Sequence, residues 1–311
     1  MAVGCVWDDR YLARGVPEHP EGPARLTAVR RALEEARLWD RLVAIAPRPA
    51  DEAVLLRVHT RPHVRSILGT AGTREAVWFD GDTYASAGSA EAAVLAAGGV
   101  CAAADAVMSG QVRAAFAAVR PPGHHALANR AMGFCLFNNV AVAARHVQAA
   151  GLRRILIADW DLHHGNGTQA LFYEDPDVLY ISTHQWPLYP GTGSAEETGK
   201  GRGEGTTRNY PLRPGSGDAE FLAALDDGLS HAERFAPEFI FISAGFDAHR
   251  DDPLGGLRLT EEGFAEATHR VRRLADRTAS GRVVSVLEGG YNLDALGRSV
   301  VAHVRALLAP A

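Results

Sequence analysis

Short apolar runs that alternate with helical stretches constrain the fold of this chain more than any other feature of its sequence. Most of the runs lack a polar residue at every second position, which is typical of strands buried on both faces of a parallel sheet. The predicted strands cover residues 114–119, 154–158, 178–182, 239–243 and 283–287. The predicted helices cover residues 24–38, 89–108, 138–150, 218–235, 260–279 and 293–308. This alternation predicts an α/β fold with a mostly parallel central sheet flanked by helices.

The composition and charge of the chain exclude several classes of protein. With 311 residues, 47% of them hydrophobic, the chain can bury a sizeable core in one large domain or two small ones. Its formal net charge is −5, so there is no global electrostatic basis for holding a polyphosphate backbone. We therefore expect no nucleic-acid partner.

The N-terminus and the cysteines indicate a cytoplasmic protein. Asp8, Asp9 and Arg10 interrupt the N-terminus before an apolar signal region could form. The Ala-rich stretch at residues 92–108 is judged too short and too weakly hydrophobic to span a bilayer, so no membrane partner is expected. The three cysteines have no CxxC spacing, which suits a reducing compartment.

Polar segments follow four of the predicted strands, at the point where each strand ends. Their sequences are RPPGHHA at 120–126, DWDLHHGNGTQ at 159–169, AGFDAH at 244–249 and EGGYN at 288–292. Ligands of open parallel sheets bind beyond the carboxyl ends of the strands. We therefore expect these four segments to line one pocket.

Two of these segments contain the elements of a metal site. Asp161 and His163 are two residues apart, so their side chains share a face in an extended segment, and Asp247 comes from another strand end. Two carboxylates and one imidazole leave an open coordination position, as a catalytic site requires. The set suits zinc, iron, cobalt or manganese. The alternative is that the aspartates merely cap the next helix, which accounts poorly for the clustered acids and histidines.

The remaining polar residues suit acid–base chemistry. His124 and His125 follow a Pro-Pro-Gly turn; one can accept a proton from water while the other carries positive charge. Asp159 and Asn166 are candidate partners for their second ring nitrogens, and a charged and a neutral partner would separate the two pKa values. Tyr291, at a Gly-Gly turn, could donate a hydrogen bond to a carbonyl oxygen or an oxyanion.

Together these segments resemble the histone deacetylase superfamily, which also includes acetylpolyamine amidohydrolases and acetoin-utilisation proteins. Asn166 and the segment at 247–253 resemble the class II and bacterial branch. The resemblance spans nearly the whole chain in the family's order, at residues 19–21, 25–26, 120–125, 133–135, 159–169, 189–193, 243–247 and 288–291.

The resemblance implies a fold and a cofactor. The fold is an arginase-like three-layer α/β fold, here a single catalytic domain over residues 1–311. The metal is Zn²⁺, with Fe²⁺ or Co²⁺ as alternatives, and its ligands are Asp161, His163 and Asp247. K⁺ is also expected, near the backbone of Asp159, Asp161 and His163 and the hydroxyl of Ser182.

The same resemblance implies roles for the acid–base residues. His125 is the general base and acid, and His124 is its electrostatic partner. Asp159 supports His124, and Asn166 supports His125. Tyr291 polarises the acyl carbonyl. A narrow tunnel to the metal is expected to be walled by Gly133, Phe134 and Tyr189, with Leu254 at its rim.

The implied activity is that of a zinc-dependent deacetylase, which removes acetyl or other short acyl groups from acylated lysine side chains. One alternative is an enzyme for acetylated polyamines or other small amines, although the rim residue Leu254 is not acidic. A non-catalytic acyl-ligand binding module and a two-metal ureohydrolase rank lower. A homo-oligomer remains open. His184 and Asp82 are weaker candidates for the outer part of the pocket.

Overall fold

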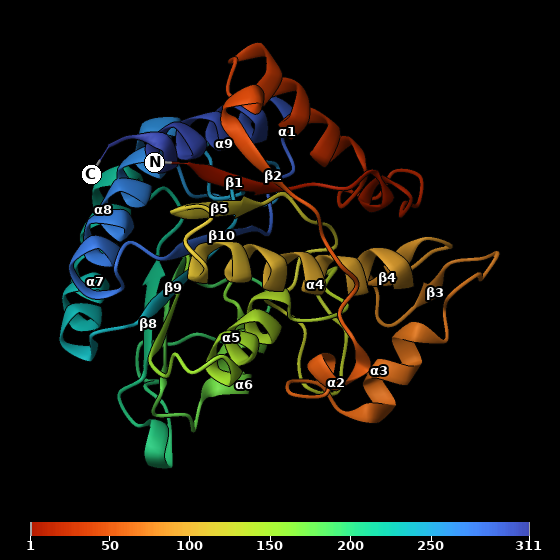
Figure 1. Cartoon of the computed structure of the whole chain (residues 1–311), viewed down its shortest axis with the longest axis horizontal. Coiled ribbons are helices and arrows are strands. Elements are labelled where there is room, and N and C mark those ends of the chain that lie inside the picture. Colours follow the sequence, from red (N-terminus) through yellow and green to blue (C-terminus); the bar gives the residue numbers. More distant parts are fainter. Residues whose placement is uncertain (1, 311) are drawn as a thin grey trace.

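An eight-stranded sheet lies at the centre of the computed structural model, which describes residues 2–310 (Figure 1). All neighbouring strands run parallel. Along the sheet the order is β2 (Leu42–Ile45), β1 (Val3–Val6), β5 (Ala114–Ala117), β10 (Val283–Leu287), β9 (Phe239–Ala244), β6 (Ile155–Asp159), β7 (Val178–Gln185) and β8 (Thr207–Leu212). The predicted α/β class with a parallel sheet is confirmed.

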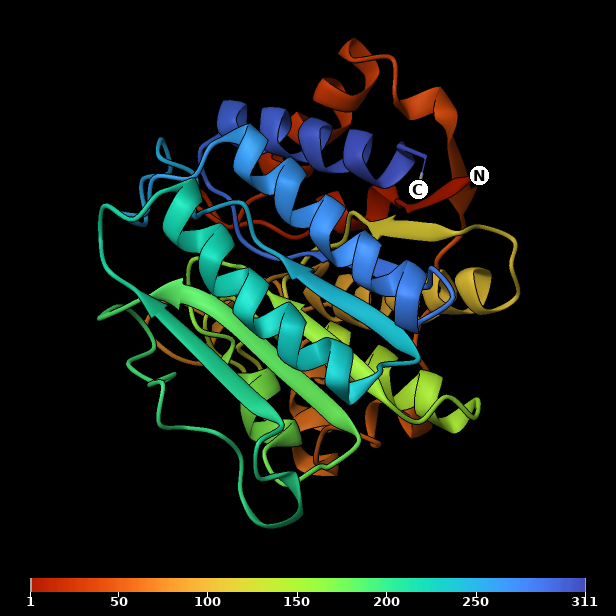
Figure 2. The same ribbon diagram turned by 90° about the vertical axis from the view of Figure 1, so that its left-hand side faces the viewer.

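Helices cover both faces of this sheet and give the molecule three layers (Figures 1 and 2). The helices of one face pack against one another in the order α1 (Ala24–Glu35), α9 (Leu293–Leu308), α8 (Glu261–Thr278) and α7 (Asp218–Phe235). The other face carries α4 (Ser89–Met108), α5 (Asn139–Ala149) and α6 (Asn166–Phe172). Outside the layers lie α2 (Glu52–Leu55), α3 (Arg61–Leu68) and a hairpin of β3 (Val77–Trp78) and β4 (Tyr84–Ala85).

Helix α4 differs from its sequence-based description in one respect. It has 20 residues with a mean hydropathy of 1.5, so by length and composition alone it could cross a membrane. The helix predicted at residues 89–108 is confirmed. The judgement that its stretch at residues 92–108 is too short and too weakly hydrophobic to span a bilayer does not hold for the whole helix, which also includes residues 89–91. Most of its residues are buried between α5 and the sheet, as in the core helix of a globular protein.

Three strands of the main sheet, β1, β2 and β8, have no counterpart among the predicted strands. β1 and β2 contain four residues each, too few for a periodic pattern to stand out. β8 has the sequence TRNYPL and lies at the edge of the sheet, where a strand need not be apolar on both faces. The five predicted strands, β5, β6, β7, β9 and β10, all lie in the interior of the sheet and are buried throughout, as β1 also is.

The buried His303 predicts a dependence of stability on pH. It lies between α9, α8 and β10, where its ring contacts the hydroxyls of Thr268 at 2.7 Å and Ser285 at 2.8 Å. Burial lowers its pKa from 6.5 to about 3. Below pH 6.5 the unfolded chain therefore takes up a proton that the folded chain does not, and folding loses free energy as the pH falls.

We expect this residue alone to reduce the free energy of unfolding by about 2 kcal/mol between pH 8 and pH 5. The measurement is urea unfolding at both pH values for the wild type and His303→Gln. The variant should show the smaller difference between the two pH values, by about this amount. An equal pH difference in the two proteins would contradict the prediction.

Candidate metal centre and active site

The carboxyl ends of β5, β6, β9 and β10 meet at one edge of the sheet, because the four strands are parallel neighbours. The segments that follow them carry the polar residues singled out in the sequence. The structure brings eight of these residues into one cluster: His124, His125, Asp159, Asp161, His163, Asn166, Asp247 and Tyr291.

Asp161, His163 and Asp247 form the part of the cluster that could hold a metal ion. Their ligand atoms lie within 4.8 Å of one another. His163 Nδ1 is 3.1 Å from Asp161 Oδ1 and 3.2 Å from Asp247 Oδ2. The backbone N–H of Gly289 donates to Asp161 Oδ2 at 2.8 Å, and that of Leu162 donates to Asp247 Oδ1 at 2.9 Å. These contacts fix both carboxylates with an oxygen of each near the imidazole.

The electrostatics of this triad favour a bound cation. Burial and the charge of Asp161 raise the pKa of Asp247 to about 7. Burial alone would lower the pKa of His163, but the adjacent carboxylates of Asp161 and Asp247 raise it to about 10. Asp247 Oδ2 is buried and accepts no hydrogen bond among the described residues. A site with surplus negative charge and an unpartnered carboxylate oxygen fits a divalent metal.

Glycines leave the space that the two carboxylates need. A Cβ atom on Gly245 would lie 2.1 Å from Asp161 Oδ2, and one on Gly289 would lie 2.1 Å from Asp247 Oδ2. Any other residue at these positions would displace a carboxylate oxygen from the cluster. The close approach of the backbone therefore explains the glycine in each of the two strand-end segments.

The two adjacent histidines have different partners and opposite pKa shifts. His124 Nδ1 lies 3.0 Å from Asp159 Oδ2, and His125 Nδ1 lies 2.8 Å from Asn166 Oδ1. Burial opposes a charged His124, but Asp159 and Asp161 raise its pKa to about 10. Burial and the positive charges of His124 and His163 lower the pKa of His125 well below 6.5. The pair therefore offers one cationic and one neutral imidazole.

Glu288 holds the turn that carries this pair. Its Oε2 accepts from the backbone N–H groups of Gly123 at 2.7 Å and His124 at 3.2 Å, and its Oε1 accepts from the Ser243 hydroxyl at 3.1 Å. Burial raises the pKa of Glu288 to about 7. No role of Glu288 could be predicted from the sequence, because a contact with backbone N–H groups requires no particular partner residue.

Arg25 supports the loop of Tyr291 from the side of α1. Its Nε donates to the carbonyl oxygen of Gly290 at 2.7 Å, and its Nη2 donates to that of Glu288. The guanidinium lies 4.9 Å from the centroid of the Tyr291 ring, a cation–π contact. Gly290 has a φ of +124°, which a side chain would strain. Burial raises the pKa of the Tyr291 phenol well above 10, so it is a hydrogen-bond donor at neutral pH.

A cavity of about 250 Å³ leads to this cluster. All four predicted tunnel residues line it. Its mouth also includes Asp82, which was a weaker candidate from the sequence, and Leu188, which was not predicted. The lining consists of Asp82, His125, Gly133, Phe134, His163, Leu188, Tyr189, Leu254 and Tyr291. The ring centroid of Tyr189 is 5.1 Å from that of His125, and the Phe134 centroid is 5.8 Å from that of Tyr291. Two aromatic side chains thus line the cavity, each beside one of the acid–base groups.

Two residues with assigned or suspected roles lie behind the cavity. Ser182 on β7 is opposite Asp159 on β6, and its hydroxyl contacts His184 Nδ1 at 2.9 Å. His184 Nε2 contacts the carbonyl oxygen of Gly193 at 2.9 Å, and burial lowers the pKa of His184 to about 3. His184 is therefore a neutral, hydrogen-bonded structural residue and does not line the cavity.

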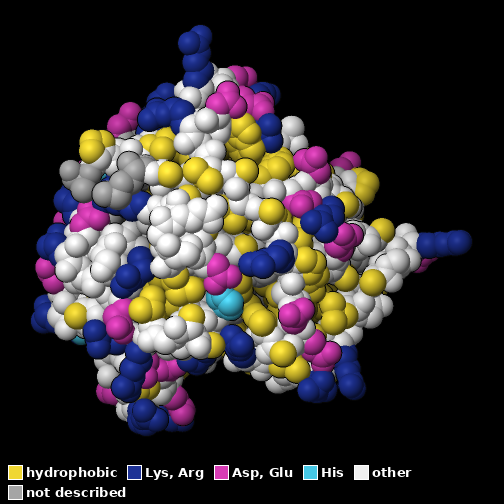
Figure 3. Space-filling model, viewed as in Figure 1, with side chains coloured by type: hydrophobic (Ala, Val, Ile, Leu, Met, Phe, Trp, Pro, Cys, Tyr) yellow, Lys and Arg dark blue, Asp and Glu magenta, His cyan; other side chains and the backbone are white. Residues whose placement is uncertain are grey.

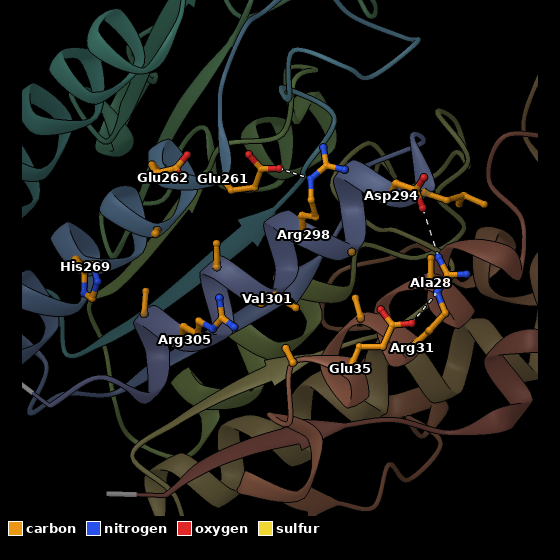
Figure 4. A pocket seen from close by; sticks show the side chains of 17 residues that line it. Ala28, Arg31, Glu35, Glu261, Glu262, His269, Asp294, Arg298, Val301 and Arg305 are labelled. Carbon is orange, nitrogen blue, oxygen red and sulfur yellow. Dashed lines mark hydrogen bonds and ion pairs between the residues drawn. The ribbon is translucent and has the colours of Figure 1, made fainter.

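A larger groove of about 880 Å³ lies elsewhere, between α1, α8 and α9 (Figure 4). Its charged side chains pair with one another: Arg298 with Glu261 at 2.5 Å, and Arg31 with Asp294 at 3.4 Å. Small side chains such as Ala28 and Val301 form its floor. The groove contains none of the clustered acid–base residues, so the smaller cavity at the strand ends is the candidate active site.

Comparison with known proteins agrees with this site. Residues 19–307 match the histone deacetylase domain family. A probable deacetylase of Archaeoglobus fulgidus is 43% identical over 94% of this chain and 82% of its own length. Histone deacetylase 15 of Arabidopsis thaliana is 44% identical over 99% of this chain, but this covers only 56% of the plant protein.

A solved structure gives the same result for the fold. The crystal structure of the HDA15 HD domain matches with a TM-score of 0.95 and 42% identity, over 99% of this chain and 88% of the other. The expected arginase-like deacetylase fold is therefore confirmed. With the family match over most of its length and relatives above 40% identity, the chain belongs to the histone deacetylase family.

Proposed function

We propose that this protein is a zinc-dependent deacetylase that hydrolyses the amide bond of acetylated, or otherwise short-acylated, lysine side chains. The observation that carries the proposal is one cavity of about 250 Å³ lined by His125, His163 and Tyr291. A proton acceptor, a metal-ligating imidazole and a phenol donor thus face the same small space. Membership of the histone deacetylase family supports the reaction class.

Asp161, His163 and Asp247 would hold the metal, since their donor atoms and surplus charge fit a divalent cation. Two carboxylates and one imidazole are within the range of ligands that zinc takes in catalytic sites, and iron(II) or cobalt(II) would also suit them. When bound, the ion supplies Lewis-acid polarisation of the amide carbonyl and lowers the pKa of a water molecule.

The residues of the chain carry the proton transfers. His125 is kept neutral by burial and by two cationic neighbours, so it can accept a proton from the attacking water. Asn166 holds the other ring nitrogen of His125 and thereby fixes the direction in which the acceptor nitrogen points. The protonated His125 then donates to the leaving lysine amine. His124, held positive by Asp159, favours negative charge nearby.

Tyr291 acts on the oxygen of the acyl group. Its phenol is protonated at neutral pH and lines the cavity beside Phe134. A donor in this place stabilises the negative charge that develops on the carbonyl oxygen as water attacks. Arg25 restrains the ring and the two carbonyl groups of its loop, so the phenol is held in place before the substrate binds.

The walls of the cavity favour an acyl-lysine over a free acylated polyamine. Phe134 and Tyr189 give apolar contact suited to the four-carbon stem of lysine, and Leu254 extends that surface at the rim. Asp82 is the one carboxylate at the mouth, and it lies where the peptide backbone or a cationic group of the substrate would enter. A polyamine remains the alternative that the experiment below separates.

No broad patch of one charge stands out on the face drawn in Figure 3. Basic and acidic side chains are interspersed on the face drawn in Figure 3, in keeping with a net charge of −5. The substrate we propose is therefore recognised at the cavity and not by a broad charged surface. A K⁺ ion near the backbone of Asp159, Asp161 and His163 and the Ser182 hydroxyl is a further proposal, supported by the pairing of Asp159 with Ser182 on adjacent strands.

A substrate panel with a matched variant tests the proposal. The zinc-loaded protein is assayed on acetyl-lysine peptides, longer acyl-lysine peptides and acetylated polyamines. We expect acetyl-lysine peptides to be hydrolysed fastest. Tyr291→Phe should lower kcat on them by about 10²–10³-fold with a small change in KM, because a transition-state donor is lost.

The panel can also refute the proposal. Preference for acetylated polyamines would move the function to small-amine metabolism. Unchanged turnover in Tyr291→Phe would remove the role of the phenol. Tight binding of an acetylated peptide without any product, in protein that retains its metal, would identify a binding module instead of an enzyme.

A further inference from the structure

Asp252 contacts the loop that carries Tyr291, which Arg25 also contacts. Its Oδ2 accepts hydrogen bonds from the backbone N–H groups of Tyr291 at 2.6 Å and Asn292 at 3.1 Å. Its Oδ1 accepts from the backbone N–H of Leu254 at 3.0 Å. The residue is only 6% exposed. Both carboxylate oxygens are thus engaged by backbone donors from two different segments.

The loop needs such a restraint from outside. Two consecutive glycines, Gly289 and Gly290, precede Tyr291, and glycine adds more backbone freedom than any other residue. Arg25 binds carbonyl groups before the tyrosine, whereas Asp252 binds N–H groups at and after it. Arg25 and Asp252 therefore hold the loop through groups of opposite polarity. Arg25 binds carbonyl groups that precede Tyr291 in the chain, and Asp252 binds the N–H groups of Tyr291 and the residue after it.

The same carboxylate also reaches the rim of the cavity. Leu254 lies two residues after Asp252, in the segment that connects β9 to α8, and it lines the same cavity as Tyr291. A change in the position of Asp252 would therefore move the rim and the phenol together. Its partners are all backbone groups, so the carboxylate sets the conformation of both segments without entering the cavity.

We propose that Asp252 is a positioning residue for catalysis: by binding the backbone N–H groups of Tyr291, Asn292 and Leu254, it holds the phenol at the acyl carbonyl and the rim around the substrate stem. This inference rests on the proposed function. Asp252 itself touches no reacting atom; it acts through Tyr291. A misplacement of about 1 Å at a reacting group can cost roughly 10²-fold in rate.

The test compares two substrates that differ in their need for the phenol. One is an acetyl-lysine peptide, and the other is the same peptide with a trifluoroacetyl group. The fluorines withdraw electrons from the carbonyl, so its hydrolysis depends less on a hydrogen bond from Tyr291. The variant is Asp252→Asn, which keeps the size of the side chain but replaces one acceptor oxygen by an N–H donor facing backbone donors.

We expect Asp252→Asn to lower kcat on the acetyl peptide by about 10–100-fold and to lower kcat on the trifluoroacetyl peptide much less. Tyr291→Phe should show the same pattern. In the double variant, Asp252→Asn should add less than about twofold to the loss from Tyr291→Phe, because the two residues act as one unit. The control is Asp251→Asn, since Asp251 is the exposed neighbour that pairs with Arg298 at 3.3 Å; it should stay within about twofold of the wild type.

Two results would overturn the inference. One is an equal loss on both substrates; the other is a loss in the double variant that equals the product of the single losses. Either would mean that Asp252 acts on folding or on binding and not through the phenol. A wild type without turnover on either peptide would instead count against the proposed function, so the two failures are distinguishable.

Amide hydrogen exchange of the wild-type holoenzyme gives an answer that does not depend on the variant folding. If Asp252 binds the N–H groups of Tyr291 and Asn292, both should exchange at least about tenfold more slowly than unprotected amides. Exchange of both at the unprotected rate would show that the carboxylate does not hold the loop, and the inference would fall.

Discussion

Replacing Asp247 by Asn should abolish both metal retention and deacetylation. Asp247 Oδ2 is buried, accepts no hydrogen bond among the described residues and faces His163 Nδ1 at 3.2 Å, which suits the proposed role of Asp247 as a metal ligand. A neutral amide at this position removes one of two carboxylate ligands. Because the ion supplies several kcal/mol of transition-state stabilisation, we expect kcat/KM to fall by at least about 10³-fold.

The same variant should have the opposite effect on the stability of the metal-free protein. Burial and the nearby charge of Asp161 raise the pKa of Asp247 to about 7, so an ionised Asp247 opposes folding when no metal is bound. After chelation, Asp247→Asn should therefore unfold with a free energy roughly 1–3 kcal/mol higher than the wild type at pH 8. Higher stability of the metal-free variant is the result expected where a residue serves metal binding at the expense of the stability of the fold.

Three measurements check this prediction: metal content by elemental analysis, hydrolysis of an acetyl-lysine peptide, and urea unfolding after chelation. Asp251→Asn serves as the control, since Asp251 lies on the same segment and its side chain is 48% exposed. A variant that retains one metal per chain and substantial activity would show that Asp247 is not a ligand. Lower stability without metal would show that its charge is balanced within the protein.

The composition of the candidate site could be predicted from the sequence because its residues follow buried parallel strands. The apolar runs before His124, Asp159 and Asp247 mark where β5, β6 and β9 end, and parallel neighbours bring those ends together. The positions of these residues after apolar runs therefore indicate that they lie close together in the fold. The edge strand β8 lacks this signal, since its sequence, TRNYPL, is not apolar on both faces.

The residues that support the site could not be predicted in this way. Apart from the Ser243 hydroxyl at Glu288, the hydrogen-bond donors to Glu288 and Asp252 are backbone N–H groups, which every residue except proline possesses, so a sequence pattern does not identify them. Arg25 donates to the carbonyl groups of Glu288 and Gly290, which lie 263 and 265 positions further along the chain. Only the folded backbone shows which loops these charges restrain.

The difference in pKa between the two histidines has a cause that the sequence shows only in part. A charged partner for one ring and an amide for the other can be read from Asp159 and Asn166. The lowered pKa of His125 depends first on burial and then on the charges of His124 and His163, whose ring centroids are 4.0 Å and 5.9 Å from its own. The first distance follows from the adjacency of the two histidines in the chain, whereas the second arises from the packing of two strand ends.

His125→Gln should therefore be the most damaging change among the acid–base residues. The neutral imidazole is the group that can accept and return a proton, and such catalysis contributes about 10²–10⁴-fold. We expect kcat to fall within this range, with KM and metal content close to those of the wild type. His124→Gln should cost less, because it removes a positive charge and not the proton carrier.

The comparison of these two variants decides the assignment of roles. Rates are measured on one acetyl-lysine peptide, with metal content determined for each protein and His303→Gln as a control for loss of a buried histidine that does not line the cavity. If His124→Gln were the slower enzyme at equal metal content, the cationic ring would be the proton carrier and the roles would be exchanged. If both variants kept full activity, the attacking water would lose its proton without either imidazole, and the opposite pKa shifts of the pair would have only a structural meaning.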